Sequence, residues 1–232
     1  MRIRIRSKKD LNVKNKKSPS KKIKRFSKVI YRRGLPLRDG ASTEIYDYLI
    51  KQKKPSDMRD FVWRRNRIVV TLMRVGGLRV SETREIKWKE VKDSFSTYEL
   101  NVYQPKTKTY RKVLLSEMAL KSLNDLSADF KAVFQDRDEW CLGNSAVGRL
   151  VRKDNWIKNI NRFMRPASKV FKKTLSSHSF RVNYITRLLQ FFPINKVRTM
   201  VGHKSIGSTA MYDRYVVDTK QFQDVFDKVL ST

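Results

Sequence analysis

The stretch that decides the fold is residues 72–88, which read LMRVGGLRVSETREIKW. Apolar residues before Gly76 recur at the helical period. The pair Gly76 and Gly77 predicts the end of a long helix that begins near Pro55, because glycine readily adopts the left-handed conformation that follows a helix. Residues 79–86 then predict a short helix that begins on an arginine. A long helix, a tight break and a cation at the start of the next helix therefore follow one another.

Most of the chain on either side of this break has a helical pattern. Before it, Ser42 and Thr43 offer an N-cap for an amphipathic helix. After it, a turn rich in cations separates two stretches of strand-forming residues. We expect strands at 95–103 and 110–115, and helices near 116–134, 145–164, 177–191, 194–200, 205–214 and 217–230. The sequence thus predicts an α+β fold, mainly α, with a small antiparallel strand unit.

The charge of the chain indicates a polyanionic partner. The 232 residues include 53 Lys and Arg against 22 Asp and Glu, a formal net charge of +31 at pH 7. A compact protein with this surplus repels itself, and nucleic acid is the ordinary partner that relieves the repulsion. An anionic membrane surface fits less well, since no basic amphipathic helix dominates and no run of 18 apolar residues exists. We therefore expect nucleic acid and no membrane, although charge alone also fits an RNA- or ribosome-associated protein.

The positive charge is concentrated near the N-terminus. Residues 1–33 hold 15 Lys and Arg and a single acid, Asp10. A block of like charge without periodicity buries too little apolar surface to order itself. We therefore expect a basic flexible arm at 1–33 and one folded domain at 34–232. The arm fits contact with a nucleic-acid backbone, and a solubilising tail or an organelle transit segment fits the same composition.

Histidine and cysteine are scarce, which limits the possible chemistry. The chain has His178, His203 and Cys141 and no other residue of either type, so a four-ligand zinc site made of Cys and His is excluded. No set of Asp and Glu has the spacing that a metal-dependent nuclease needs, and we expect no metal. His178 precedes Arg181 by three residues, and two cationic donors on one helix face suit a phosphodiester. A solvated arginine beside a partly buried histidine is the plainer interpretation of this spacing.

A second group of candidates lies further along the chain. His203 directly follows Gly202, and Tyr212 comes nine residues later. A glycine that ends one helix lets the histidine lie in a turn that faces the next helix. Arg79, just after Gly77, could reach the same point. Each of these signals is weak by itself.

Together these residues resemble the motifs of the tyrosine recombinases, the phage-integrase family. Residues 77–82, GLRVSE, followed by 86–88, IKW, resemble the first catalytic box. Residues 178–181, HSFR, are similar to the His-x-x-Arg box, and residues 202–203 with Tyr212 are similar to the Gly-His and nucleophilic tyrosine of the same box. The resemblance implies a tyrosine-recombinase-like catalytic domain of the DNA breaking-rejoining type, over 34–232. The 33-residue arm is too short for the separate core-binding domain that usually precedes it, which would need roughly 50 residues.

The resemblance also implies roles for residues of the strand unit and the first box. Lys106 matches the lysine of the family's strand-turn-strand unit by its offset from 113–115, and Lys108 is the alternative. Glu82 is expected to support the cations, since a carboxylate on the phosphate would repel it. We also expect Lys108 and Arg111 to bind DNA. The implied catalytic set is Arg79, Lys106, His178, Arg181, His203 and Tyr212.

Tyrosine at position 212 is the implied nucleophile. A phenol with a pKa near 10 is a weak nucleophile, so the hydroxyl needs neighbouring cations and a polarised phosphorus. Tyr215, three residues after Tyr212, and Tyr184, three residues after Arg181, could also approach the site. Only the spacing from the Gly-His pair selects Tyr212 among them.

The function implied by the resemblance is a site-specific DNA recombinase or integrase. Such an enzyme cleaves and rejoins double-stranded DNA through a 3′-phosphotyrosyl intermediate without cofactor, metal or ATP. A type IB topoisomerase, a hairpin-telomere resolvase and an inactive DNA-binding relative remain alternatives. We expect self-association into a synaptic tetramer, with the apolar stripe at 217–229 docking on a neighbouring protomer. An intracellular location is expected, either a bacterial cytoplasm or nucleoid, or an organelle such as a plastid or mitochondrion.

Overall fold

A computed structural model describes residues 39–213, and the structural statements below concern that range. The arm predicted at 1–33, Tyr215 and the helix predicted at 217–230 lie outside the described residues.

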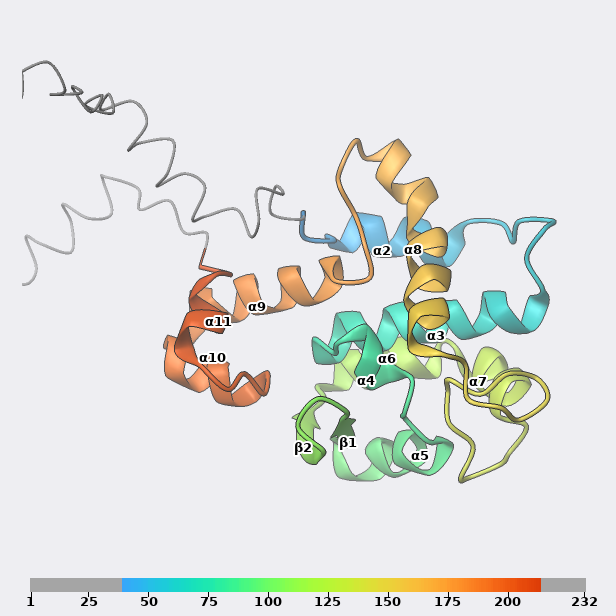
Figure 1. Cartoon of the computed structure of the whole chain (residues 1–232), viewed down its shortest axis with the longest axis horizontal. Helices are drawn as coiled ribbons and strands as arrows, with labels where there is room; N and C mark the ends of the chain where they lie inside the picture. Colours follow the sequence, from blue (N-terminus) through green and yellow to red (C-terminus); the bar gives the residue numbers. More distant parts are fainter. Residues whose placement is uncertain (1–38, 214–232) are drawn as a thin grey trace, which may run out of the picture. The chain divides into compact units, whose positions relative to one another are not determined.

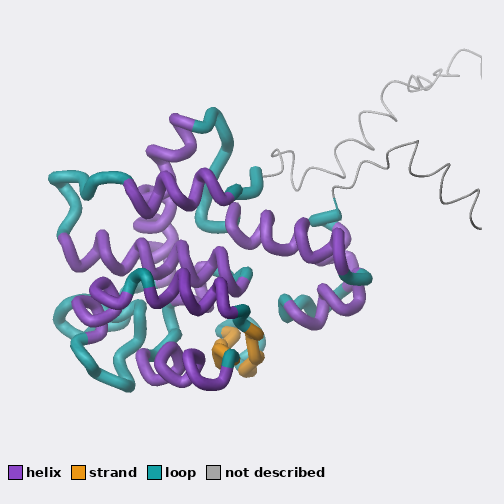
Figure 2. Tube along the Cα trace, turned by 180° about the vertical axis from the view of Figure 1, so that it is seen from behind, coloured by secondary structure: helices purple, strands orange, loops and turns teal. Residues whose placement is uncertain are grey.

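The described residues form a mainly helical fold with one small antiparallel sheet (Figures 1 and 2). The predicted fold class is confirmed. The elements, in chain order, are α2 (Thr43–Lys51), α3 (Asp60–Gly76), α4 (Val80–Thr83), α5 (Trp88–Thr97), β1 (Glu99–Gln104), β2 (Thr109–Leu114), α6 (Glu117–Asn124), α7 (Ser127–Phe134), α8 (Lys153–Val170), α9 (Ser179–Phe191), α10 (Ile194–Met200) and α11 (Ile206–Ala210).

Helix α3 is the central element of the core. Its residues Ile68, Val69, Val70, Leu72 and Met73 are fully buried. Burial over consecutive positions means that neighbours cover α3 on most sides, and α2, α6, α7, α8 and α9 all pack against it. Helix α8 crosses α3 in Figure 1. Within residues 39–213, no helix has the length and apolarity that a membrane span requires.

The break after α3 has the conformation that the sequence predicts. Gly77 has a φ of +57°, and a Cβ there would lie 2.2 Å from the ring of Tyr184. Glycine is therefore required both for the backbone conformation and for space. The short helix predicted at 79–86 is confirmed in position but shorter, since α4 ends at Thr83. Trp156 of α8 donates from Nε1 to the carbonyl oxygen of Val80 at 2.7 Å and so fixes α4 to the core.

The predicted strand unit is a single hairpin. Strands β1 and β2 are antiparallel, with Glu99 opposite Leu114 and Gln104 opposite Thr109. The first strand begins later than predicted, because residues 95–97 belong to α5, which the sequence analysis missed. The ring of Trp88, at the start of α5, stacks on two phenylalanines of α7. This packing, rather than the local pattern, decides the helical conformation.

Several of the predicted helices differ in extent. The helix predicted from near Pro55 begins only at Asp60, as α3, and the helix predicted at 205–214 is the shorter α11, which ends at Ala210. The helix predicted at 116–134 is divided into α6 and α7, and Ser116 caps α6 by accepting a hydrogen bond from the Ala119 amide. The helix predicted at 145–164 begins only at Lys153 and continues to Val170. Residues 141–152 before it form a loop, in which Gly148 has a φ of +82° that a helix does not accommodate.

Candidate active site

Most of the predicted site residues meet at the junctions between helices. Arg79 and Glu82 lie at α4, and His178 is the residue before α9, which carries Arg181. His203 lies in the turn between α10 and α11. Tyr212 follows α11. The hydrogen bonds and ring contacts described below join these segments into one cluster, which we call the arginine–tyrosine cluster.

Arg181 is the most deeply buried member of the cluster. Its side chain is fully buried, and its guanidinium donates from Nη1 to the Gly77 carbonyl at 2.5 Å and from Nη2 to the Val201 carbonyl at 2.7 Å. One side chain thus holds together the turn after α3 and the turn after α10. Burial lowers the pKa of Arg181 to about 9, with a contribution from neighbouring Arg79, so the group stays protonated at pH 7.

Glu82 is a buried carboxylate enclosed by cations. Its Oε1 accepts from Arg79 Nη1 at 2.6 Å, and its Oε2 accepts from the Arg79 amide at 2.9 Å and from Arg111 Nη2 at 3.1 Å. Burial by itself raises the pKa of Glu82, but Arg111, Arg181 and Arg79 outweigh that effect and lower it. The carboxylate is therefore ionised and holds the guanidinium of Arg79 in one orientation.

Tyr212 lies with its hydroxyl against the imidazole of His178. Tyr212 Oη and His178 Nε2 are 2.9 Å apart, and the Tyr212 backbone carbonyl accepts from Thr186 Oγ1 at 3.2 Å. Tyr184, an alternative nucleophile, instead packs its ring against Gly77, and burial raises the pKa of its phenol. The geometry thus brings Tyr212, and not the ring of Tyr184, to the histidine.

His203 packs against the ring of Tyr212. The two rings are stacked, with centroids 5.7 Å apart and an interplanar angle of 24°. His203 Nδ1 is 2.9 Å from Thr209 Oγ1. Burial lowers the pKa of His203 to about 3, and the nearby Arg181 and Arg79 add to the effect. The imidazole is therefore neutral at pH 7, and if Thr209 donates to Nδ1, the ring proton is left on Nε2 as a donor.

The hairpin contributes an inward-pointing arginine and an exposed turn. Arg111, expected to bind DNA, has a side chain only 10% exposed, and it contacts Glu82 and the Met200 carbonyl, the latter at 3.1 Å. Lys106 and Lys108 are exposed in the turn between β1 and β2. Among described residues, no hydrogen bond or ion pair joins Lys106 to the cluster. The contacts made by Thr209 and Arg111 have no signal in the sequence, because they depend on how distant turns pack.

The cluster has a surplus of positive charge. Arg79, Arg111 and Arg181 surround one carboxylate, that of Glu82. Three guanidinium groups against one carboxylate favour an anion at this place. Over residues 39–213, no group of three or more His, Cys, Asp or Glu side chains could hold a metal ion. The arrangement can therefore bind a phosphate-like anion beside a tyrosine hydroxyl.

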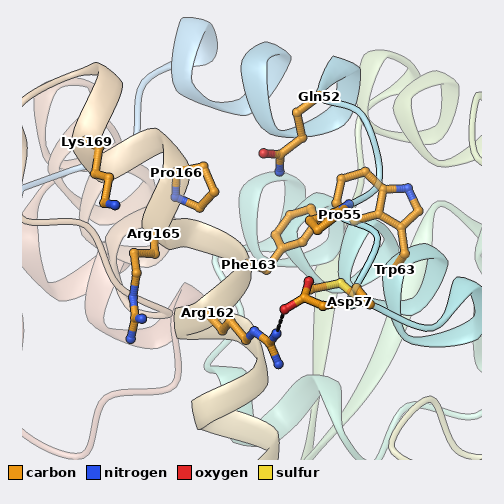
Figure 3. A pocket seen from close by; sticks show the side chains of 10 residues that line it. Gln52, Pro55, Asp57, Trp63, Arg162, Phe163, Arg165, Pro166 and Lys169 are labelled. Atoms are coloured by element: carbon orange, nitrogen blue, oxygen red, sulfur yellow. Dashed lines mark hydrogen bonds and ion pairs between the residues drawn. The ribbon is translucent and has the colours of Figure 1, made fainter.

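A hollow of about 290 Å³ lies apart from this cluster, between the α2–α3 connection and α8 (Figure 3). It is lined by Gln52, Pro55, Asp57, Met58, Trp63, Arg162, Phe163, Arg165, Pro166 and Lys169, none of them a predicted site residue. Arg162 is paired with Asp57 across it, as the dashed line in Figure 3 shows. The cationic rim of this hollow is therefore partly neutralised.

Fold and site together define a mainly helical domain in which three arginines and two histidines lie around a tyrosine hydroxyl. Residues 43–217 match the phage integrase family, and the chain belongs to this family. The predicted family membership is confirmed.

Sequence comparison gives one curated relative, a "probable integrase/recombinase protein" of Methanocaldococcus jannaschii. It is 28% identical over 199 residues, which are 83% of this chain and 57% of that protein. The chain thus spans little more than half the length of this relative.

Several solved structures share the fold. The XerA recombinase matches with a TM-score of 0.57 and 18% identity, over 85% of this chain and 65% of its own. The XerH site-specific recombinase bound to its difH substrate matches with a TM-score of 0.55 and 19% identity, over 80% and 54%. A lambda integrase tetramer bound to a Holliday junction matches with a TM-score of 0.52 and 17% identity, over 79% and 51%. All three are recombinases or integrases with the same helical architecture.

Proposed function

We propose that the protein is a site-specific DNA recombinase or integrase that cleaves and rejoins DNA through a 3′-phosphotyrosyl intermediate. The observation that carries the proposal is the contact of Tyr212 Oη with His178 Nε2 inside a cluster of guanidinium groups. A nucleophile beside a proton acceptor, with cations ready for a charged phosphorane, is the arrangement that phosphoryl transfer to a tyrosine requires. We infer that residues 34–232 form the catalytic domain.

Cleavage begins with attack of Tyr212 Oη on the scissile phosphorus. A bond forms between Oη and phosphorus, and the phenolic proton passes to His178 Nε2. The bond between phosphorus and the 5′-oxygen breaks, and Lys106 or, as the alternative, Lys108 gives a proton to that oxygen. An ammonium on the exposed turn of the hairpin suits this general-acid role, because the turn is free to approach DNA.

The other residues of the arginine–tyrosine cluster act on the non-bridging oxygens of the phosphate. Arg79 and Arg181 stabilise the charge that develops on them, with Glu82 orienting Arg79. His203 adds a neutral donor, consistent with its lowered pKa. A neutral imidazole can donate a hydrogen bond to a phosphate oxygen without adding a further positive charge beside the guanidinium groups.

Rejoining is the reverse of cleavage. A 5′-hydroxyl attacks the phosphotyrosine and gives its proton to the lysine that cleavage left neutral. The bond from phosphorus to Tyr212 Oη breaks, and the proton held by His178 returns to the phenol. The phosphodiester energy is kept in the phosphotyrosine, so the cycle needs neither ATP nor a metal ion.

Double-stranded DNA is the proposed substrate, and a synaptic tetramer the proposed working form. The XerH complex with difH and the lambda integrase tetramer on a Holliday junction are the solved relatives that support this assignment. The net charge of +31 supports it independently. We further propose contact of the 1–33 arm with the DNA backbone, docking of the 217–229 stripe on a neighbouring protomer, and an intracellular setting.

The decisive experiment is capture of a covalent adduct. Nicked duplexes with a randomised core are incubated with the full chain, and protein–DNA adducts that survive denaturing detergent are selected and sequenced. We expect an enriched set of sequences, loss of the adduct in Tyr212→Phe and its retention in Tyr184→Phe. An adduct that persists in Tyr212→Phe would refute the assigned nucleophile, and no adduct from any pool would refute the cleavage activity.

A strand-exchange assay on the selected duplexes distinguishes a recombinase from a topoisomerase. Two such duplexes, differently labelled, should exchange strands. Relaxation of a supercoiled plasmid that carries the selected sequence, without exchange between sites, would favour a type IB topoisomerase instead.

A further inference from the structure

Within the described residues, one side chain of β2 adds hydrogen bonds to the packing that joins the hairpin to the arginine–tyrosine cluster. Arg111 is nine-tenths buried and donates from Nη2 to Glu82 Oε2 and from Nη1 to the Met200 carbonyl, both at 3.1 Å. It therefore links β2, the Arg79-bearing helix α4 and the end of α10. Its neighbour in sequence, Lys112, is 66% exposed and pairs with Glu99 within the hairpin.

A close backbone contact reinforces this attachment. Gly202 has a φ of +64°, and a Cβ there would lie 2.3 Å from Gln104 Nε2 and 3.0 Å from Arg111 Cδ. Both strands of the hairpin thus lie directly on the turn that precedes His203. The Gln104 carbonyl also accepts from the amides of residues 107 and 108, which closes the turn on which Lys106 lies.

The turn itself has little that could fix its position. Lys106 and Lys108 are exposed, and so is Thr109 at the start of β2. The position of the Lys106 ammonium relative to the cluster must therefore be set by buried residues of the strands. Arg111 is the one among them that is hydrogen-bonded to α4 and to the end of α10.

We propose that Arg111 is a positioning residue that locks the hairpin, and with it the general-acid lysine of the turn, onto the phosphate-binding arginines. This proposal rests on the proposed function. Both terminal nitrogens of the Arg111 guanidinium are occupied by Glu82 and by the Met200 carbonyl, so we assign the side chain to positioning rather than to the DNA contact expected from the sequence. A general acid must lie within hydrogen-bond reach of the leaving oxygen, and a misplacement of about 1 Å can lower the rate by about 100-fold.

The proposal can be tested through the leaving group. In the normal substrate the bond from phosphorus to the 5′-oxygen breaks, and a proton from the lysine ammonium goes to that oxygen. When sulfur replaces this bridging oxygen, the leaving group departs as a thiolate, since thiols have a pKa near 8.5, and no proton donor is needed. A variant whose only defect is the loss of the general acid should therefore form the adduct on the sulfur substrate at a rate close to that of the wild type.

The experiment measures adduct formation by the full chain on a selected duplex with oxygen or sulfur at the bridging position. We expect Arg111→Met to be about 100-fold slower than wild type on oxygen and to come within several-fold of wild type on sulfur, as Lys106→Ala does. If Lys108 is the general acid, then Lys108→Ala rather than Lys106→Ala should be slow on oxygen and recover on sulfur. Arg79→Ala should stay slow on both substrates, because it acts on the non-bridging oxygens. Lys112→Met, the matched control on the exposed face, should resemble wild type.

A second measurement needs no DNA. Hydrogen–deuterium exchange in residues 99–114 should be about tenfold faster in Arg111→Met than in wild type, while exchange in α3 stays unchanged. Arg111→Lys, which keeps the charge but cannot bridge both partners, should show an intermediate exchange rate and the same recovery on sulfur.

The outcomes separate this proposal from the function on which it rests. If wild type forms an adduct and Arg111→Met is equally slow on oxygen and sulfur, Arg111 supports the fold or the arginines and the proposal is wrong. The proposal would also be wrong if Arg111→Met formed the adduct on the oxygen substrate at the wild-type rate. Unchanged hydrogen–deuterium exchange in residues 99–114 would contradict it too. A wild type that forms no adduct on either substrate refutes the proposed function itself.

Discussion

Two regions of the molecule each bury an arginine, and they treat it differently. Arg65, in the middle of α3, is 2% exposed, donates to the Asn144 carbonyl at 3.0 Å and lies over the Trp156 ring at 4.8 Å. Arg181 is fully buried, donates to two carbonyls and lies near Glu82 and Tyr212. Burial lowers the pKa of both, to about 10 for Arg65 and about 9 for Arg181.

Burial and a lowered pKa are shared by both arginines, so only their surroundings tell them apart. Arg65 is held among aromatic rings, where its guanidinium and aliphatic stem fill space in the core. Arg181 is held among other cations, an ionised carboxylate and a tyrosine hydroxyl, where repulsion from Arg79 and Arg111 opposes its charge. An anion would relieve that repulsion, so the surroundings of Arg181 are the ones that predict a ligand.

The largest expected effect is on cleavage in Arg181→Gln. Removing one pre-organised cationic donor should slow adduct formation on a selected duplex by about 10²–10³-fold. The rate is measured by adduct yield against time in denaturing gels, with circular dichroism to verify folding. Cleavage at the wild-type rate would mean that Arg181 is a packing residue like Arg65 and that the two arginines do not differ in role.

The sequence predicted the members of the cluster better than its internal contacts. The order and spacing of five residues resemble the motifs of a known family, and this resemblance predicted them as site residues. They are Arg79, His178, Arg181, His203 and Tyr212. The inward orientation of Arg111 could not be predicted, since a strand with cations on both faces carries no sign of which face is buried. That orientation depends on the end of α10 and on Glu82, which are distant in sequence.

The fold shows the same limit. Helix α3 and its glycine break follow from a local pattern and from the φ that Gly77 adopts. Helix α5 was missed and the start of α8 was misplaced, because the first depends on the stacking of Trp88 on α7 and the second on a loop with glycine at 148. Local patterns predict elements whose ends carry their own signals, and tertiary packing decides the others.

A second prediction concerns the other arginine. Arg65→Ala removes a side chain packed against Trp156 and should lower the free energy of unfolding by about 2 kcal/mol. Denaturant titration measures this change. At a temperature where the variant is folded, adduct formation should remain within about twofold of wild type. A loss of cleavage as large as that of Arg181→Gln would show that the two regions are functionally coupled. It would contradict the view that Arg65 only stabilises the core.

A third prediction uses the glycines beside the two anchoring carbonyls. Gly202 follows the Val201 carbonyl that holds Arg181, and Gly148 lies in the loop whose Asn144 carbonyl holds Arg65. Gly202→Ala forces a Cβ to within 2.3 Å of Gln104 Nε2 and should slow adduct formation by about tenfold.

The matched variants test whether the effect is local. Gly148→Ala strains a backbone of similar φ, +82°, and should lower stability by about 1 kcal/mol without slowing cleavage. At Gly207 a Cβ would meet nothing within 4 Å, so Gly207→Ala should leave both properties unchanged. Equal losses of cleavage in all three variants would mean that the rate reports general destabilisation only.

The smallest expected effect is on the pH dependence of stability. It concerns the Arg181 region, because the partly buried His203 lies there and not beside Arg65. Burial, together with Arg181, Arg79, His178 and Arg111, lowers the pKa of His203 from 6.5 to about 3. Between these values the unfolded chain binds a proton that the folded chain does not, so folding loses stability as pH falls below 6.5. We expect a loss of about 1 kcal/mol between pH 7.5 and 5.5, measured by denaturant titration.

His203→Gln provides the control for this measurement, because it removes the titrating group and keeps a polar side chain. Its free energy of unfolding should change less over the same interval than that of the wild type. Other groups, including Glu82 with its lowered pKa, titrate alike in both proteins and cancel in the difference. Equal slopes for the two proteins would mean that His203 binds its proton in the folded state as readily as in the unfolded chain. The cations around Arg181 would then be too well screened to repel a further charge, and charge repulsion would not favour an anion beside them.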